Sequence, residues 1–216
     1  MDFLAELRTS AVEGNADRVE ELTRKALDKG IEVQEILNEG LIAAMDAVGE
    51  RFENEELFIP EMFLAAEAMN RGLEILRPLF VEKGIKPQGT LVIGTVEGDR
   101  HDLGKRLVAM MMVSAGFKVI DLGVDVSPEK FVEAVKRETA QLVGMSALLT
   151  TTLPAMKATI EMLKEAGLSD KVKTLIGGVP VTQGYADEIG ADGYAPDAAT
   201  GVKKAKELVQ SLVASA

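Results

Sequence analysis

The 216-residue chain contains no cysteine and no tryptophan, and it has only one histidine. Without cysteine the chain can form no disulfide, iron–sulfur cluster or thiolate metal site, and it has no cysteine nucleophile. With one histidine, a zinc or iron site built from several imidazoles is excluded as well. Aromatic residues make up only 4% of the chain, so a surface that stacks nucleic-acid bases is not expected.

Positive charge and long apolar runs are also scarce. The formal net charge is −11, which argues against a nucleic acid or an anionic membrane surface as a partner. No run of about 18 apolar residues is present, and the first residues lack the basic start and apolar stretch of a signal peptide. We therefore expect a cytoplasmic protein of globular composition, with 47% hydrophobic residues.

The first part of the chain has the apolar period of helices. Apolar residues recur three and four apart from Leu37 to Phe52 and again from Met62 to Leu76. The pattern predicts helices near residues 2–13, 16–28, 33–52 and 60–82. Because the connections between them are short, we expect an N-terminal four-helix bundle over residues 1–86.

The rhythm changes after a stretch with one proline and two glycines, residues 83–89, which we expect to be a linker and hinge. Short apolar, β-branched runs then alternate with amphipathic helices. The predicted strands lie near residues 91–96, 118–122, 142–146, 173–176 and 193–195. Such alternation predicts an α/β domain over residues 87–216, with a flavodoxin-like (Rossmann-like) parallel sheet covered on both faces. Ligands of these sheets bind at the carboxyl ends of the strands.

The single histidine, His101, lies in the loop that follows the first predicted strand, within Gly98-Asp-Arg-His-Asp-Leu-Gly104. An imidazole on such a loop, with Asp99 two residues before it, suits a single axial metal ligand. A lone histidine is more often an ordinary surface or core residue, so the loops after the other strands must decide.

These other loops are rich in small residues, hydroxyls and glycines and carry few charges. They span residues 146–152, 177–182 and 194–198. Glycine lets backbone approach a ligand closely and hydroxyls supply neutral hydrogen bonds, so the set suits a bulky, mostly neutral ligand. The alternative is that the glycines form only a turn and the threonines only a helix cap.

Three common nucleotide and phosphate folds do not match. The loop from Gly98 to Gly104 lacks the middle glycine of the dinucleotide motif, and Asp99 and Asp102 would repel phosphate. No Gly-Lys-Ser/Thr phosphate loop is present. The third strand ends in Ser146, where a phospho-acceptor receiver domain needs an aspartate.

The chain resembles the cobalamin-binding proteins. The motifs that carry the resemblance follow one another as Asp99-x-His101-x-x-Gly104, Ser146-x-Leu148 and Gly177-Gly178. The helical part, with Gly40-Leu41-x-x-x-Met45 and Phe58-Ile59-Pro60-Glu61, resembles the helical cap of the methyltransferase branch. That branch contains the B12 module of methionine synthase and the small corrinoid proteins of methanol, methylamine and O-demethylase systems.

The resemblance implies a corrinoid methyl carrier that cycles between Co(I) and methyl-Co(III). It implies base-off/His-on cobalamin, in which His101 replaces the cofactor's own base as lower axial ligand of cobalt. Asp99 would hydrogen-bond the other imidazole nitrogen. Ser146 would extend this pair to a proton relay or bond the nucleotide tail.

The remaining implied contacts surround the cofactor. The corrin underside would meet Arg100, Asp102 and Leu103, and Gly104 would let the helix begin close to the tail. The residues implied along the tail are Leu148, Thr150, Thr151, Gly177, Gly178, Tyr194, Ala195 and Ala198. The apolar candidates for shielding the upper corrin face are Met45, Phe52, Phe58, Met62 and Met69, for which plain core packing is the alternative.

The implied partners are a substrate-specific methyltransferase, a second methyltransferase with tetrahydrofolate or a thiol as acceptor, and a reductive activation protein. The chain is not expected to turn over alone. Two alternatives remain: a B12-dependent sensor or regulator, which adds a basic DNA-binding head, and the cobalamin subunit of a carbon-skeleton mutase, which lacks the helical cap.

Overall fold

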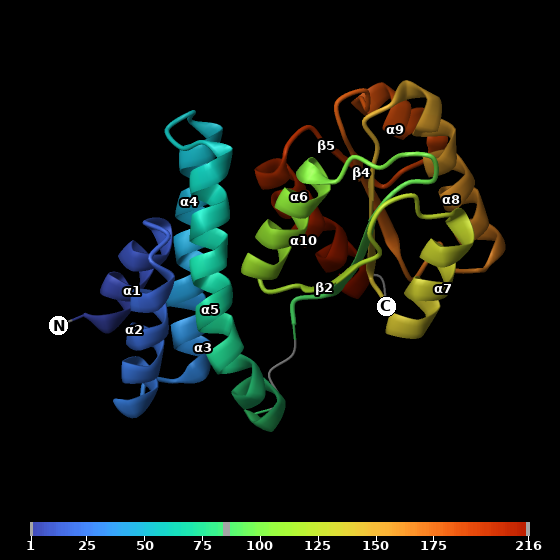
Figure 1. Ribbon diagram of the computed structural model, residues 1–216. Helices are drawn as coiled ribbons and strands as arrows, with labels where there is room; N and C mark the ends of the chain where they lie inside the picture. Colours follow the sequence, from blue (N-terminus) through green and yellow to red (C-terminus); the bar gives the residue numbers. More distant parts are fainter. Residues whose placement is uncertain (1, 84–86, 215–216) are drawn as a thin grey trace. The chain divides into compact units, whose positions relative to one another are not determined.

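The computed structural model describes residues 2–83 and 87–214 (Figure 1). The chain divides into two compact units, one within residues 1–86 that also takes in 114–116, and one formed by residues 87–113 and 117–216. Residues 84–86 of the expected linker and hinge lie outside the described residues. No helix in the described part of the chain is long and apolar enough to cross a membrane.

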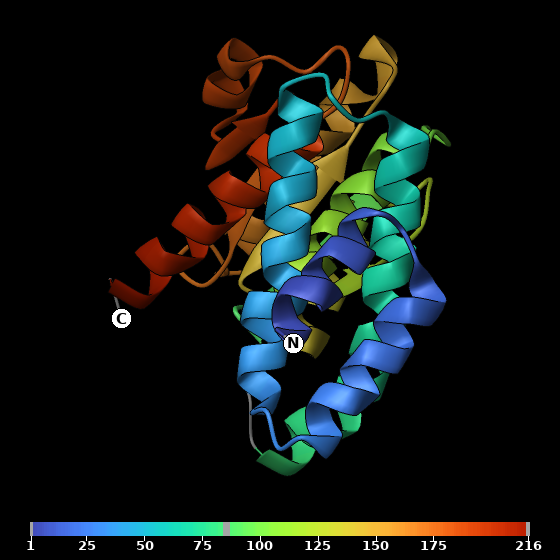
Figure 2. The ribbon, with the colours of Figure 1, turned by 90° about the vertical axis from the view of Figure 1, so that its left-hand side faces the viewer.

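The first unit is built from helices (Figure 2). Its elements are α1 (Phe3–Val12), α2 (Ala16–Asp28), α3 (Val33–Glu35), the π-helix η1 (Ile36–Ile42), α4 (Ala43–Glu53) and α5 (Ile59–Lys83). Asp2 caps α1 by accepting hydrogen bonds from two backbone N–H groups, and Asn15 caps α2 in the same way with one. The predicted helical N-terminal part is confirmed.

The third predicted helix contains a π-helical segment that the sequence pattern did not reveal. The N–H of Ala43 donates to the carbonyl of Asn38, five residues back. Gly40 lies in this segment, where a Cβ would stand 2.6 Å from Cδ2 of Leu7 in α1. Leu37 and Leu41 of the segment are four residues apart and both buried, a spacing that an α-helix gives as well, so the apolar pattern does not distinguish the two helix types.

The methionines singled out as cofactor shields pack in the core of the helical unit. Met45, Met62 and Met69 are at most 4% exposed, whereas Phe58 is 70% exposed. Phe52 is half-buried. Core packing therefore accounts for the three methionines, and Phe58 is the candidate whose side chain is mostly exposed.

The second unit is a five-stranded parallel sheet in the order β2-β1-β3-β4-β5. Its elements are β1 (Thr90–Thr95), α6 (Leu103–Ser114), β2 (Lys118–Asp121), α7 (Pro128–Glu138), β3 (Leu142–Ser146), the 3₁₀ turn η2 (Thr150–Thr152), α8 (Leu153–Glu165), β4 (Lys173–Gly177), α9 (Gln183–Ile189), β5 (Gly193–Ala195) and α10 (Ala198–Ala214). This is the flavodoxin-like strand order, so the predicted α/β fold is confirmed.

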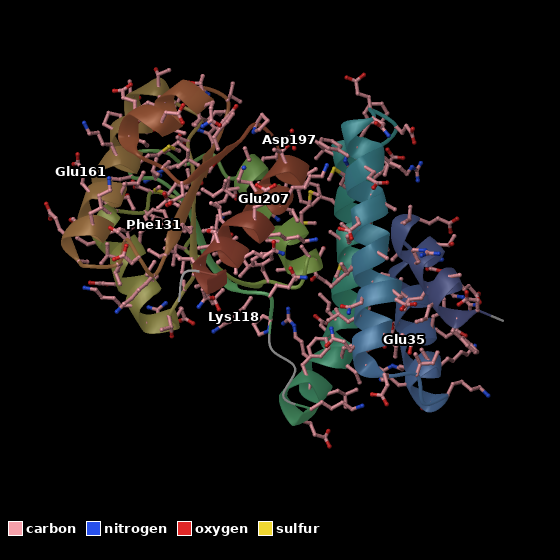
Figure 3. All side chains as sticks on the ribbon, turned by 180° about the vertical axis from the view of Figure 1, so that it is seen from behind. Glu35, Lys118, Phe131, Glu161, Asp197 and Glu207 are labelled. Carbon is pink, nitrogen blue, oxygen red and sulfur yellow. The ribbon has the colours of Figure 1, made fainter. Side chains whose placement is uncertain are left out.

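Helices cover both faces of this sheet, with α7 and α8 on one face and α6 and α10 on the other (Figure 1). All six residues of β1 are buried, which explains why the strand is apolar without alternation. Phe131 of α7 is fully buried against the sheet (Figure 3). A Cβ on Gly94 of β1 would lie 2.9 Å from its ring, so this glycine allows α7 to pack closely.

The strand order places the carboxyl ends of β1 and β3 next to each other, where the following connections diverge. This is the topological switch point at which ligands of such sheets bind. The register aligns Thr95, Ser146, Gly177 and Ala195 in one row across four strands. The fold thus brings three of the predicted site residues to the same edge of the sheet.

Candidate functional site

The centre of the candidate site is the pair His101 and Asp99, in the loop between β1 and α6. Nδ1 of His101 lies 2.7 Å from Oδ1 of Asp99. The Asp99 side chain is fully buried, while 54% of the imidazole is exposed. Because an ionised carboxylate can only accept, Nδ1 carries the hydrogen and the neutral ring keeps a lone pair on Nε2. Nε2 is therefore the ring nitrogen that is able to bind a metal.

The Asp99 carboxylate is also bound by the loop that follows β3. Its Oδ2 accepts hydrogen bonds from the N–H groups of Leu148, at 2.6 Å, and Leu149, at 3.1 Å. The hydroxyl of Thr152 lies 3.2 Å from the same oxygen. Asp99 therefore joins the two loops across the switch point and holds His101 to both.

These hydrogen bonds determine the charge of Asp99. Burial by itself raises the pKa of the carboxyl, but the N–H groups of His101 and Leu148, the His101 ring and the N–H of Leu149 together outweigh it. They hold the pKa of Asp99 far below its ordinary range. The carboxylate consequently stays negative at neutral pH and fixes the tautomer of the imidazole.

Exposed apolar side chains come from the loops around His101. Leu103 at the start of α6 is 56% exposed, Leu148 and Leu149 after β3 are each 40% exposed, and Val179 after β4 is 84% exposed. Apolar side chains gathered at the carboxyl edge of the sheet indicate a ligand that covers them. Together with one available ring nitrogen, they suit a large apolar metal complex.

The glycines of the predicted motifs differ in what surrounds them. Gly178 has φ of 128°, and a Cβ there would lie 1.9 Å from the carbonyl oxygen of Ala147. A Cβ on Gly177 would lie 2.8 Å from the carbonyl oxygen of Ala195. The fold itself therefore requires this pair. At Gly104, in the first turn of α6, a Cβ would meet nothing within 4 Å.

Near the histidine, the other predicted residues take varied positions. The Arg100 side chain is 83% exposed. The carbonyl of Asp102 accepts from the N–H of Arg106 at 2.8 Å, which starts α6. Ser146 ends β3, but its hydroxyl is not among the groups that bind Asp99 in the described part of the chain.

The hydroxyl that does reach Asp99 belongs to Thr152, which sequence reasoning missed. Thr150 and Thr151 of the same short turn are exposed, whereas Thr152 is buried. Three consecutive threonines give no signal of which one points inward, because that depends on the 3₁₀ turn they form.

The predicted residues that follow β4 in the sequence have structural roles in the second unit. Tyr194 packs against the apolar core of the second unit. Ala195 and Ala198 are buried, and Ala198 begins α10. Asp197, labelled in Figure 3, caps this helix by accepting from the N–H of Thr200 at 2.7 Å. The structure thus gathers the predicted residues at one sheet edge, and their roles toward a ligand stay predictions.

Comparison with known proteins finds B12 binding domains in both parts of the chain. One such domain matches residues 89–203 and a second matches residues 4–77. The dimethylamine corrinoid protein of Methanosarcina barkeri is 46% identical over 209 residues, 96% of this chain and 98% of that protein. The corrinoid protein DSY3155 of Desulfitobacterium hafniense is 42% identical over 212 residues, 97% of this chain and 98% of its own.

Solved structures agree in fold. A cobalamin-binding protein from Desulfitobacterium hafniense matches with a TM-score of 0.80 and 33% identity, over 96% of this chain and 98% of its own. A chain of the methanol:cobalamin methyltransferase complex of Methanosarcina barkeri matches with a TM-score of 0.86 and 30% identity, over 97% of this chain and 80% of its own.

The residues of the site fit a corrinoid. The macrocycle supplies the equatorial nitrogens of its cobalt, so the protein needs to offer only one further nitrogen, and Nε2 of the half-exposed His101 ring is available for that role. The exposed leucines and Val179 suit the apolar surface of the ring, and no atom lies within 4 Å of the position that a Cβ of Gly104 would take. The chain belongs to the B12-binding corrinoid proteins, and its cofactor is cobalamin.

Proposed function

We propose that the chain is the methyl-carrying corrinoid subunit of a methyltransferase system. It would receive a methyl group through a substrate-specific methyltransferase and pass it to a second methyltransferase that uses tetrahydrofolate or a thiol. The observation that carries the proposal is the exposed His101 nitrogen, oriented by buried Asp99, in a chain similar over nearly its whole length to a dimethylamine corrinoid protein. When bound, cobalamin supplies a cobalt that takes up and releases the methyl group.

His101 would occupy the lower axial position, with the cofactor's own base displaced. Asp99 holds the hydrogen on Nδ1, so Nε2 presents its lone pair without rearrangement. The bonds from Leu148 and Leu149 keep the carboxylate in place, so the ring would keep its orientation whether or not the metal is bound to it.

The displaced nucleotide tail would follow the open side of α6. Gly104 leaves space there, and the exposed hydroxyls of Thr150 and Thr151 can bond its polar edge. Because Thr152 and not Ser146 binds Asp99, we assign Ser146 to the tail in preference to a proton relay.

The axial ligand can be tested by electron paramagnetic resonance of the Co(II) form. Because the chain has a single histidine, labelling with ¹⁵N-histidine marks one residue. Axial ¹⁴N splits each Co(II) line into three and ¹⁵N into two, so we expect doublets from labelled protein. Glu161→Ala, a change at an exposed residue of α8 outside the site, should keep the doublets, and His101→Ala should lose them. Triplets from the labelled wild type would mean that the cofactor's own base is bound instead.

The carrier role needs a separate assay with partners. The reduced holoprotein is mixed with methylamine- and methanol-specific methyltransferases and their donors, and the absorbance of reduced cobalamin is followed. We expect rapid decay with one cognate pair and no decay without the methyltransferase. Methyl uptake at the same rate from the free donor would contradict the carrier role. The expected reductive activation protein would be needed to restore oxidised cofactor.

A further inference from the structure

Asp125, in the loop between β2 and α7, lies outside the predicted site but contacts the loop that bears His101. Its Oδ1 accepts a hydrogen bond from the N–H of Gly98 at 2.8 Å. Its own N–H donates to the carbonyl of Asp99 at 2.9 Å. Asp125 therefore binds the two residues at the start of the turn that leads to His101.

The backbone at this contact is unusual on both sides. Asp125 has φ of 54° and Gly98 has φ of 82°, both in the left-handed region. For a residue other than glycine this conformation costs energy, although aspartate and asparagine tolerate it best. The N–H of Val126 donates to the carbonyl of Thr95, and the N–H of Thr95 donates to the carbonyl of Gly123, each at 3.0 Å. The two loops are therefore held in register.

The same segment also holds the helix that follows His101. Lys105, in the first turn of α6, has a side chain that is 2% exposed and forms an ion pair with Asp121 at the end of β2. Asp121 also accepts from the N–H of Gly123 at 2.8 Å. The segment from Asp121 to Val126 thus supports the histidine loop at its beginning and at its end.

We propose that Asp125 is a positioning residue for His101. The loop after β3 holds the carboxylate of Asp99, and the main-chain N–H of Asp125 holds its carbonyl. The Asp125 carboxylate adds a hold on the N–H of Gly98, one residue earlier, so the loop that leads to His101 is fixed from both sides of the switch point. This proposal rests on His101 being the cobalt ligand, as proposed above. Gly98 is exposed, so water can replace the lost acceptor for its N–H, and the chain should fold without the carboxylate. What is lost is the placement of Nε2.

Two variants separate the carboxylate from the backbone conformation. Asp125→Asn keeps an acceptor oxygen and tolerates the left-handed φ. Asp125→Gly permits the left-handed φ and removes the acceptor. Both variants lose the ion pair of Asp125 with Arg100, whose guanidinium lies 3.9 Å from Oδ2, so the two variants differ in the acceptor and not in that pair. Both are reconstituted with cobalamin after ¹⁵N-histidine labelling, and the share of Co(II) that shows doublets is measured, together with cobalamin affinity.

We expect Asp125→Asn to match wild type and Asp125→Gly to bind cobalamin but to lose about half or more of the doublet share, because a loosely supported ligand binds its metal less well. A wild-type doublet share in Asp125→Gly would overturn the proposal. Asp125→Ala, which also lacks the acceptor, is measured in the same way should the glycine variant fail to fold. Absence of doublets in labelled wild type would instead refute the axial role of His101, and with it any positioning by Asp125.

Discussion

Asp99→Asn keeps the shape of the side chain but replaces one of its two acceptor oxygens by an NH₂ group, although the groups around both oxygens are donors. Both carboxylate oxygens accept only. Oδ1 takes the N–H of His101 at 3.0 Å and its Nδ1–H at 2.7 Å, and Oδ2 takes the N–H groups of Leu148 and Leu149 and the Thr152 hydroxyl. An asparagine has one acceptor oxygen, so in either orientation its NH₂ group faces donors.

The less costly orientation of the asparagine amide depends on which of the surrounding donors can become an acceptor. The N–H groups of Leu148 and Leu149 are fixed, so the amide oxygen should face them. The NH₂ group then faces His101, whose ring can switch tautomer and accept on Nδ1, while its backbone N–H loses its partner. The bond from the His101 N–H is lost and the three bonds to Oδ2 are weakened, which costs about 3 kcal/mol of unfolding free energy. The switch also places the hydrogen on Nε2, so the variant should lose the axial ligand.

Urea unfolding of the apoprotein, followed by circular dichroism, measures this cost. The pKa of Asp99 is lowered in the folded state, so its stabilisation is complete above the unfolded pKa and is lost as the pH falls. The difference from wild type should therefore be constant from about pH 5 to 8 and shrink below about pH 4. Asp125→Asn, at an exposed carboxylate, is the matched control and should stay near wild type. A loss below about 1 kcal/mol for Asp99→Asn at pH 7 would refute the reasoning.

Four further substitutions test the glycines and the helical core. Gly178→Ala should destabilise the apoprotein by about 3 kcal/mol or more, because its Cβ would overlap backbone at an unfavourable φ. Gly104→Ala should leave stability unchanged or raise it by about 0.5 kcal/mol while weakening cobalamin binding in a titration, and unchanged binding would place the tail elsewhere. In the helical unit, Met62→Ala should cost about 2–5 kcal/mol, since the side chain is fully buried. Phe58→Ala should stay within about 0.5 kcal/mol, and a larger loss would mean that its exposed ring supports the fold.

The strands and helices of the second unit could be predicted because buried parallel strands appear as short apolar runs between amphipathic helices. The π-helical segment from Ile36 to Ile42 could not, since its apolar residues Leu37 and Leu41 are four apart, a spacing that an α-helix gives as well. The buried ion pair of Lys105 could not be predicted either. A lysine in sequence indicates a solvated charge, and only the pairing of β1 with β2 brings Asp121 to it.

The residues of the site could be predicted where their chemistry lies in the side chain. His101 and Asp99 are such residues, because an imidazole and a carboxylate two positions apart are visible in any sequence. The partners of Asp99 are mainly backbone N–H groups 49 and 50 residues further along the chain, which every residue except proline possesses. The contact of Asp125 with the histidine loop could not be predicted for a related reason, since its carboxylate binds a backbone N–H, that of Gly98.

Gly104 and Gly178 look alike in the sequence, since both stand at predicted ligand loops, but the structure gives them opposite explanations. Gly178 is needed by the fold, because a Cβ would overlap the carbonyl of Ala147 even with no ligand present. Gly104 has an ordinary helical position with nothing within 4 Å of its missing Cβ, where alanine would favour the helix. A glycine without a reason in the fold is better evidence for a ligand than one with such a reason. The space at the start of α6 is therefore the part of the loop set that most directly supports the proposed approach of the cofactor to the backbone.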